Sequence, residues 1–226
     1  MSDLKVLFED NHLLVVNKPA LLPTMGVADG DESLHSLACA YLKDKYQKRG
    51  NVYLGIVHRI DSFVSGTIVL ARTSKAASRL SDQFRRRTVD KKYWAIVPDH
   101  CPDEGQLTDH LAKNETRKRM EVVTQGNPKF KASKEAKLSF RTLGKHSGFK
   151  LIEVVLETGR KHQIRVQFEN LGCPIIGDRK YGSELKFAKG IALHSNTMTL
   201  VHPTKKVIQS FQSNPPEWWN LRRFSI

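Results

Sequence analysis

The 226-residue sequence has no apolar run that approaches the roughly eighteen residues a membrane-spanning helix needs. Its start, Met1–Lys5, lacks the basic and then apolar layout of a secretion signal. Cysteine is scarce. Cys39, Cys101 and Cys173 are odd in number and form no Cys-x-x-Cys motif, so we expect free thiols in a reducing compartment. These absences argue against a membrane span and a disulfide framework, and they favour a cytoplasmic protein.

The sequence also lacks internal repeats, low-complexity tracts and linkers rich in proline, glycine and serine. Hydrophobic residues at 39% and charged residues at 27% are typical of a folded globular protein and not of a disordered one. A chain of this length can bury a substantial core within one domain. We therefore expect residues 1–226 to form a single domain.

Acidic residues are few compared with basic ones. There are 37 Lys and Arg and 23 Asp and Glu, which gives a net charge of +14 and a pI near 9.8. The excess is concentrated: residues 85–92 hold five basic residues and one acidic residue, and residues 113–137 hold eight and three. A single basic run is often only a solvated face. Two such runs on a chain this basic favour contact with the phosphates of a nucleic acid.

The apolar pattern predicts many strands in hairpins with a few helices, which is typical of an α+β protein with a largely antiparallel sheet. The predicted strands include Val52–Val57, Thr67–Ala71, Lys92–Val97, Ala136–Thr142 and Phe149–Leu156, and a terminal hairpin of Leu193–Val201 with Val207–Phe211. Residues 99–135 are polar and basic, so we expect only short strands there.

Helical spacing of apolar residues predicts three helices. These are Glu32–Lys48 with Asp31 as N-cap, Lys75–Arg87 with Ser74 as N-cap, and Arg160–Leu171 closed by Gly172. The segment Ala20–Asp31 contains proline and glycine and is predicted to be a loop.

The nine residues His58–Gly66 place the carboxylate of Asp61 close behind the cation of Arg59. They lie between two predicted strands, so they form a short polar loop at a sheet edge. Such loops display side chains, which suits a functional site more than a core. Taken alone, this loop is compatible with a hydrolase, a binding protein or a simple surface turn.

A second segment, Thr158–Phe168, places Arg165 on the last predicted helix, on the same face as His162 and Phe168. Arg165 is then at the edge of the buried stripe, where an unpaired charge is costly and a carboxylate partner is needed. Asp61 is a natural partner. The alternative is that Arg165 pairs with a surface acid and only braces the fold.

Ordered motifs between residues 17 and 203 resemble the pseudouridine synthases that modify ribosomal and transfer RNA. The matching motifs are Asn17-Lys18-Pro19-Ala20, the His58–Gly66 loop, Lys91 and Tyr93 on one strand, Gly159–Arg165, Gly172–Asp178, Tyr181-Gly182, Leu193-His194 and His202-Pro203. The resemblance implies a mixed, largely antiparallel, bisected sheet with flanking helices. It also implies a compact member of the family without a separate N-terminal RNA-binding module.

The resemblance implies an RNA pseudouridine synthase that needs no metal or cofactor. Asp61 would be the catalytic carboxylate, Arg165 would hold it ionised, and Tyr93 would stack on the target base. Arg59 would fill the stack vacated by a flipped nucleotide, with its planar guanidinium. Further contacts with RNA would come from the side chains of His58, Lys91 and Arg160. The substrate would be ribosomal RNA, transfer RNA or both, and the enzyme would act as a monomer without an obligatory protein partner.

Some residues depart from the family pattern. Ile60 stands in place of Leu, Val64 and Lys161 in place of Thr, and Gln167 in place of His. None of them replaces a predicted catalytic residue, so we expect the chemistry to be retained.

Two other functions are compatible with parts of the sequence. Several histidines and Asp61 could form the cluster of a metal hydrolase, but no His-Glu-x-x-His motif or close His-x-His pair is present. A non-catalytic RNA-binding protein would explain the charge equally well, but it would leave Asp61, Tyr93 and Arg165 without a task.

Overall fold

The computed structural model describes residues 4–26, 28 and 31–224. They divide into two compact units, Met1–Lys91 with His194–Pro215 and Lys92–Leu193 with Pro216–Ile226. Residues 27, 29 and 30 of the predicted loop Ala20–Asp31 lie outside the described residues. Within the described part, no helix is both long and apolar enough to cross a membrane. The single domain expected from the sequence stays a prediction.

The first unit contains a mixed sheet in the order β1-β2-β4-β10, with β11 paired to β10 and β3 paired to β4. Its strands are β1 (Val6–Glu9), β2 (Leu13–Lys18), β3 (Gly55–Ile56), β4 (Ser65–Ala71), β10 (Leu193–Val201) and β11 (Ile208–Gln212), and its helices are α1 (Leu34–Lys45) and α2 (Ser74–Arg86). β4 runs antiparallel to β2 and parallel to β10. The predicted strand Val52–Val57 is reduced to the two residues of β3, whereas the other strands predicted in this unit are confirmed.

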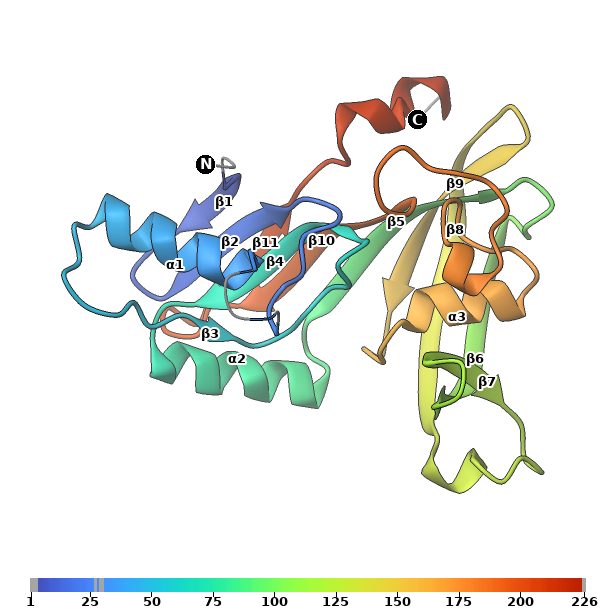
Figure 1. Ribbon diagram of the computed structural model, residues 1–226, viewed down its shortest axis with the longest axis horizontal. Coiled ribbons are helices and arrows are strands. Elements are labelled where there is room, and N and C mark those ends of the chain that lie inside the picture. Colours follow the sequence, from blue (N-terminus) through green and yellow to red (C-terminus); the bar gives the residue numbers. More distant parts are fainter. Residues whose placement is uncertain (1–3, 27, 29–30, 225–226) are drawn as a thin grey trace. The chain divides into compact units, whose positions relative to one another are not determined.

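Both faces of this sheet are covered by a helix (Figure 1). Successive side chains of a strand point to opposite faces. On β2, Leu14 and Val16 pack with α1, whereas Leu13 and Val15 pack with α2. All seven residues of β4 are buried. The continuous apolar runs of β2 and β4 therefore follow from burial on both faces.

The observed N-caps of the two helices of this unit lie two residues and one residue away from the predicted caps. Ser33, and not Asp31, caps α1, because its hydroxyl accepts from the Ser36 N–H at 3.1 Å and completes a capping box. Thr73, and not Ser74, caps α2: its extended backbone places its hydroxyl 3.2 Å from the Ala76 nitrogen. Ser74 is already the first helical residue.

The second unit contains an antiparallel sheet in the order β5-β9-β8-β6-β7, with α3 on one face (Figure 1). Its elements are β5 (Asp90–Pro98), β6 (Glu104–Asn114), β7 (Arg119–Val123), β8 (Lys134–His146), β9 (Phe149–Leu156) and α3 (Gln163–Asn170), with the 3-10 helices Phe130–Ala132, Arg179–Tyr181, Glu217–Trp219 and Leu221–Phe224. Val166 of α3 packs with Leu111, Ala136 and Tyr181. These elements confirm the α+β class with a mixed, largely antiparallel sheet and flanking helices.

Two predictions for this unit are wrong. β6 has eleven residues although only short strands were expected there, because β8 and β7 pair with it on its two sides. The helix predicted from Arg160 begins at Gln163, since His162 has a left-handed backbone at φ 55°. His162 is therefore the residue before the helix and does not share a helical face with Arg165.

Candidate active site

Asp61 lies at the start of a tight turn between β3 and β4. The Val64 N–H donates to the Asp61 carbonyl at 3.1 Å, which closes the turn. The Asp61 side chain is half-buried, and its neighbours Ile60 and Val64 are 7% and 2% exposed. The hydroxyl of Thr24 donates to the Ile60 carbonyl at 2.9 Å. The candidate carboxylate thus sits on a turn anchored by buried residues on both sides.

Gly66 ends the loop where β4 meets β10. Its φ is +122°, and a Cβ placed there would lie 2.3 Å from the Ser195 carbonyl oxygen. Only glycine permits this approach. Nearby, the fully buried His194 has its Nδ1 2.8 Å from the Ser65 hydroxyl, and burial lowers the pKa of His194 to about 4. The end of the loop is therefore fixed by strand packing.

Lys18, the last residue of β2, ties a second loop to the Asp61 turn. Its side chain is fully buried. Its Nζ donates to the backbone carbonyls of Pro19 at 2.8 Å, Leu22 at 2.6 Å and Ser62 at 3.2 Å. Burial lowers the pKa of Lys18 to about 7, and the charge of Asp61 opposes this shift. The Lys18 ammonium group thus interacts with the charge of Asp61 and also holds the carbonyl of Ser62, the residue after Asp61.

The sequence alone gives Lys18 no role beyond its place in the Asn17-Lys18-Pro19-Ala20 motif. A usable signal was present: strand alternation places Lys18 on the same face of β2 as the buried Leu14 and Val16. Such a lysine is buried only at a cost, so it needs several acceptors. The three carbonyls supply them.

His58 is held by the sheet rather than displayed. Its Nε2 accepts from the Val69 N–H at 2.9 Å, and its ring stacks on Phe84 with centroids 4.7 Å apart. Burial and the charge of Lys91 lower the pKa of His58 to about 3, so the ring is neutral. Burial and the charge of Arg87 also lower the pKa of Lys91. These contacts give His58 a packing role, and its contact with RNA stays a prediction.

Arg59 is exposed between the half-buried His58 and the buried Ile60. This position leaves its guanidinium accessible to a ligand at the surface. Arg160, in the second unit, is half-buried, and its Nε donates to the Glu135 carbonyl at 2.8 Å.

Tyr93 and Arg165 belong to the second unit. Tyr93 lies on β5, is 8% exposed and is paired with Val154 of β9. Arg165 lies on α3 and is 3% exposed. Asp61 belongs to the first unit, so its pairing with Arg165 and its approach to Tyr93 stay predictions.

Arg165 has a buried acidic partner, Asp178, that is not apparent from the sequence. Its Nε and Nη2 donate to the two carboxylate oxygens of Asp178 at 2.6 and 2.8 Å, and Asp178 is 1% exposed. Its guanidinium carbon lies 4.8 Å from the ring centroid of Tyr181. The Tyr181 hydroxyl accepts from the Met120 N–H and lies 2.7 Å from Nδ1 of His162. The two hydrogen bonds from Arg165 to Asp178 fix the plane of the guanidinium.

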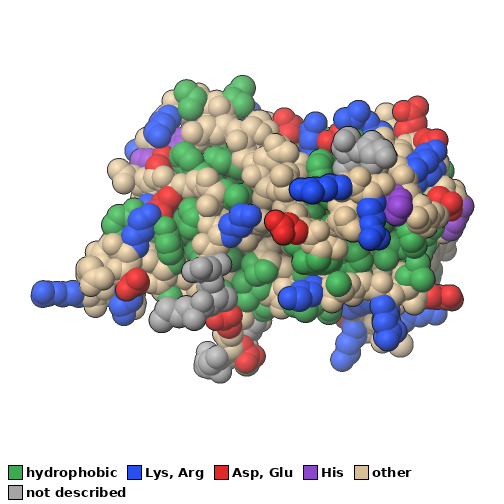
Figure 2. All heavy atoms as spheres, turned by 90° about the horizontal axis from the view of Figure 1, so that it is seen from above, with side chains coloured by type: hydrophobic (Ala, Val, Ile, Leu, Met, Phe, Trp, Pro, Cys, Tyr) green, Lys and Arg blue, Asp and Glu red, His purple; other side chains and the backbone are tan. Residues whose placement is uncertain are grey.

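The two basic runs of the sequence carry many of the exposed Lys and Arg side chains. Figure 2 shows Lys and Arg side chains over one face with apolar side chains between them. In the run 113–137, Lys113, Lys129 and Lys137 form ion pairs with nearby glutamates. In the run 85–92, Arg85 and Arg86 both approach Asp82 and stay largely exposed. Exposed pairs are weak and leave these charges accessible to phosphates.

Two further expectations concern cysteine and metals. All three cysteines are free, as expected. Among the described residues, no group of three or more His, Cys, Asp and Glu is arranged to hold a metal ion. The expectation that the reaction needs no metal or cofactor stays a prediction.

Comparison with known proteins identifies the family. The sequence profile of the RNA pseudouridylate synthases matches residues 12–170, which include the Asp61 turn, β5 and all of α3. The chain belongs to this family. It is an isomerase that acts on RNA and converts uridine to pseudouridine.

Individual pseudouridine synthases are similar over most of the chain. Ribosomal large subunit pseudouridine synthase D of Zymomonas mobilis is 33% identical over 95% of this chain and 70% of its own length. An uncharacterised RNA pseudouridine synthase of Bacillus subtilis, YhcT, is also 33% identical, over 98% and 72%. Human RNA pseudouridylate synthase domain containing 4 shares the fold, with a TM-score of 0.77 and 24% identity over 98% of this chain and 93% of its own.

Proposed function

We propose that Asp61 is the catalytic carboxylate of this pseudouridine synthase. The observation that carries the proposal is the anchored turn: Asp61 is half-buried, flanked by buried residues and coupled to the charge of Lys18. A nearby cation favours the ionised form of a carboxylate, which is the form that can act as a nucleophile or a base. Lys18 acts here as a positioning residue, because its ammonium bonds to the Ser62 carbonyl.

The proposed reaction conserves all atoms of the uridine, so it needs no second reactant. Asp61 attacks the nucleotide or first removes a proton, and the bond between uracil N1 and ribose C1′ breaks. The uracil turns and rejoins C1′ through its C5. The proton on C5 leaves and N1 gains a proton, so that no water, phosphate or redox equivalent is consumed.

The other predicted site residues act together with Asp61 in the proposed mechanism. Arg165 orients and stabilises the ionised carboxylate, with its own guanidinium held in plane by Asp178. Tyr93 stacks on the target base, which must leave the RNA stack to react. Arg59, which is exposed on the same loop, fills the vacated place. His58, Lys91 and Arg160 line the RNA path.

Ribosomal RNA is the proposed substrate. This proposal is supported by the similarity to two enzymes that are named for the large ribosomal subunit. One is from Zymomonas mobilis, and the other, from Nitrosomonas europaea, is 34% identical to this chain. Transfer RNA is the alternative. Action as a monomer in the cytoplasm, without an obligatory protein partner, stays a prediction that gel filtration and fractionation of cells would test.

The experiment is a map of pseudouridine across all RNA from a strain that lacks this gene. We expect specific ribosomal sites to vanish and to return with the wild-type gene but not with Asp61→Asn. Asp82→Asn, which makes the same change on the surface of α2, is the matched control and restores the sites. Sites restored by Asp61→Asn would refute the mechanism. If no ribosomal site depends on the wild-type gene, the proposed substrate is refuted.

A further inference from the structure

Two turns around Asp61 carry large apolar side chains that face solvent. Leu21 lies in the turn after β2 and is 55% exposed, and Phe63 lies in the Asp61–Val64 turn and is 47% exposed. A single exposed apolar residue is ordinary on a protein surface. Two on turns that meet at one site require an explanation.

Leu21 adopts a backbone conformation that disfavours its own side chain. Its φ is +70°, in the left-handed region that glycine enters freely and leucine does not. The exposed Leu21 side chain gains little from packing in return. Backbone strain that persists without a packing benefit is typical of functional positions. The turn thus keeps a leucine where glycine would fit better.

Both residues are placed beside the candidate carboxylate by the same ammonium group. Lys18 Nζ bonds to the carbonyl of Leu22 and to the carbonyl of Ser62, which are the next residues after Leu21 and before Phe63. The bond from Thr24 to the Ile60 carbonyl adds a second tie between the two loops. Leu21 therefore lies on a loop that is tied to the turn carrying both Phe63 and Asp61.

We propose that Leu21 and Phe63 form an apolar platform that receives an unpaired RNA base next to the target uridine. Proteins recognise unpaired RNA by stacking bases on aromatic and apolar side chains. The exposed Arg59 on the same loop and the net charge of +14 favour a polyanion over an apolar protein surface. The platform rests on the proposed role of Asp61 and adds a determinant of substrate choice to it.

Kinetics with RNA from a strain that lacks the gene test the platform. Phe63→Ala and Leu21→Gly are each expected to raise KM about tenfold with little change in kcat, because a stacking surface binds the RNA and does not react. Phe63→Tyr keeps the ring and retains the wild-type KM. Leu21→Gly also relieves the strained backbone, so its unfolding midpoint stays equal to that of the wild type or rises. Loss of affinity together with retained stability separates recognition from folding.

Ile208→Ser is the matched control for the loss of an exposed apolar side chain. Ile208 is 77% exposed on β11 and pairs with Val201, at the end of β10 opposite to the His194–Ser65 pair. This variant keeps the wild-type KM.

The outcomes distinguish the platform from the proposed function. If the wild type makes pseudouridine and both Phe63→Ala and Leu21→Gly keep its KM, the platform is refuted and the role of Asp61 stands. If a dimer dissociates in these variants while KM is unchanged, the face binds a second copy of the chain and not RNA. If the wild type itself makes no pseudouridine, the proposed function fails, and the platform with it.

Discussion

Lys18 in the first unit and Arg165 in the second are both buried cations, but they are held in different ways. Lys18 donates to three neutral carbonyls, and the carboxylate of Asp61 acts on it through space. Arg165 donates twice to the buried carboxylate of Asp178. Neutral carbonyls do not balance a buried charge fully, so the pKa of Lys18 falls to about 7, whereas a guanidinium stays charged at every ordinary pH.

The difference indicates two kinds of support for one reaction. The Arg165–Asp178 pair is a permanent brace, because its two hydrogen bonds join side chains that are both buried. The charge on Lys18 is conditional, and it influences the turn that carries Asp61. Disrupting the Arg165–Asp178 pair should therefore lower stability, whereas replacing Lys18 should change how stability depends on pH.

The largest effect on stability is expected from the permanent brace. Asp178→Asn keeps the shape of the side chain but removes the charge that balances Arg165, which should lower the free energy of unfolding by roughly 3 kcal/mol. Urea denaturation measures the change. Glu169→Gln removes the partly exposed pair with Arg119 and should cost less than about 1 kcal/mol. Equal losses in the two variants would contradict the distinction between buried and exposed pairs.

The conditional charge of Lys18 predicts a dependence of stability on alkaline pH. The folded pKa is about 7 and the unfolded value is 10.5, so between these values the unfolded chain binds more protons than the folded chain. Stability from this group therefore rises with pH across that window, by at most about 1.4 kcal/mol per pH unit. Lys18→Met should flatten the slope of the unfolding free energy between pH 7 and 10.

Measuring the activity of Lys18→Met tests the role of Lys18 in a second way. Lys18→Met removes the bonds that hold the loop beside Asp61, so we expect roughly a tenfold or larger fall in kcat. Lys150→Met is the matched control: Lys150 is also a buried lysine, which donates to the Cys101 carbonyl and pairs with Asp103. An equal fall in kcat in both variants would show that Lys18 only stabilises the fold.

The predictions from sequence succeeded where the local pattern was also the tertiary pattern. β4 and β9 are apolar and buried, and both were placed within two residues. β6 was missed because its sequence is mostly polar, and its strand conformation depends on pairing with β7 and β8. Context of this kind overrides local preference in strands.

The candidate site shows the same contrast between local motifs and contacts that form only in the folded chain. Asp61 and Arg59 stand together in one loop, so a local motif is enough to name both as candidates, and their roles stay predictions. Asp178 is thirteen residues from Arg165 and meets it only after the chain folds back. The helix start was misplaced because Gln163 holds the preceding segment as a turn: its Oε1 accepts from Thr158 and Arg160. Side-chain bonds of this kind leave little trace in apolar spacing.

An acidic window should depend on His58, which lies on the Asp61 loop. Its folded pKa is about 3 and its ordinary value is 6.5, so the unfolded chain binds the proton first and stability is lost as pH falls from about 6.5 toward 3. His194, with a pKa of about 4, contributes in the same direction. His58→Gln can still accept a hydrogen bond from Val69 and should reduce, but not remove, the slope of unfolding free energy between pH 6.5 and 4. An unchanged slope would contradict the neutral state of the His58 ring.

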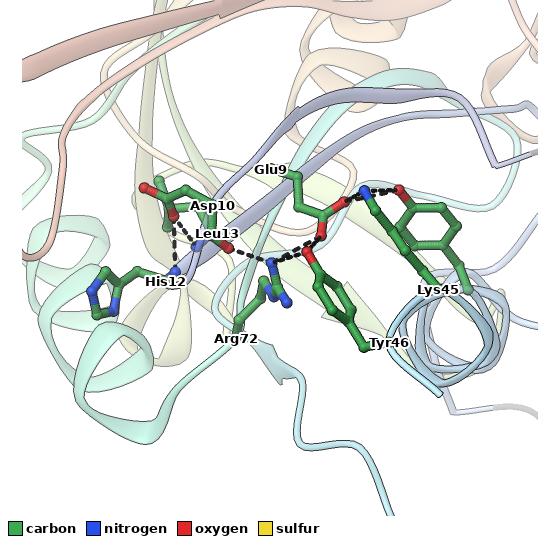
Figure 3. Close-up of polar contacts among 8 residues, drawn as sticks. Glu9, Asp10, His12, Leu13, Lys45, Tyr46 and Arg72 are labelled. Atoms are coloured by element: carbon green, nitrogen blue, oxygen red, sulfur yellow. Dashed lines mark hydrogen bonds and ion pairs between the residues drawn. The ribbon is translucent and has the colours of Figure 1, made fainter. Parts of the chain in front are cut away.

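The smallest effect is expected at Glu9 of β1, whose carboxylate contacts Lys45 and Tyr46 at the end of α1 (Figure 3). Its carboxylate accepts from Lys45, Tyr46, Tyr41 and Arg72 at 2.5 to 2.9 Å. Burial raises the pKa of Glu9, but these bonds outweigh it and lower the value to about 2. Stability from Glu9 is therefore present above about pH 4.5 and is lost as pH falls toward 2. Glu9→Gln should cost about 1–2 kcal/mol at pH 7, nothing at pH 2, and leave kcat unchanged. A fall in kcat would show that the reaction is coupled to this cluster.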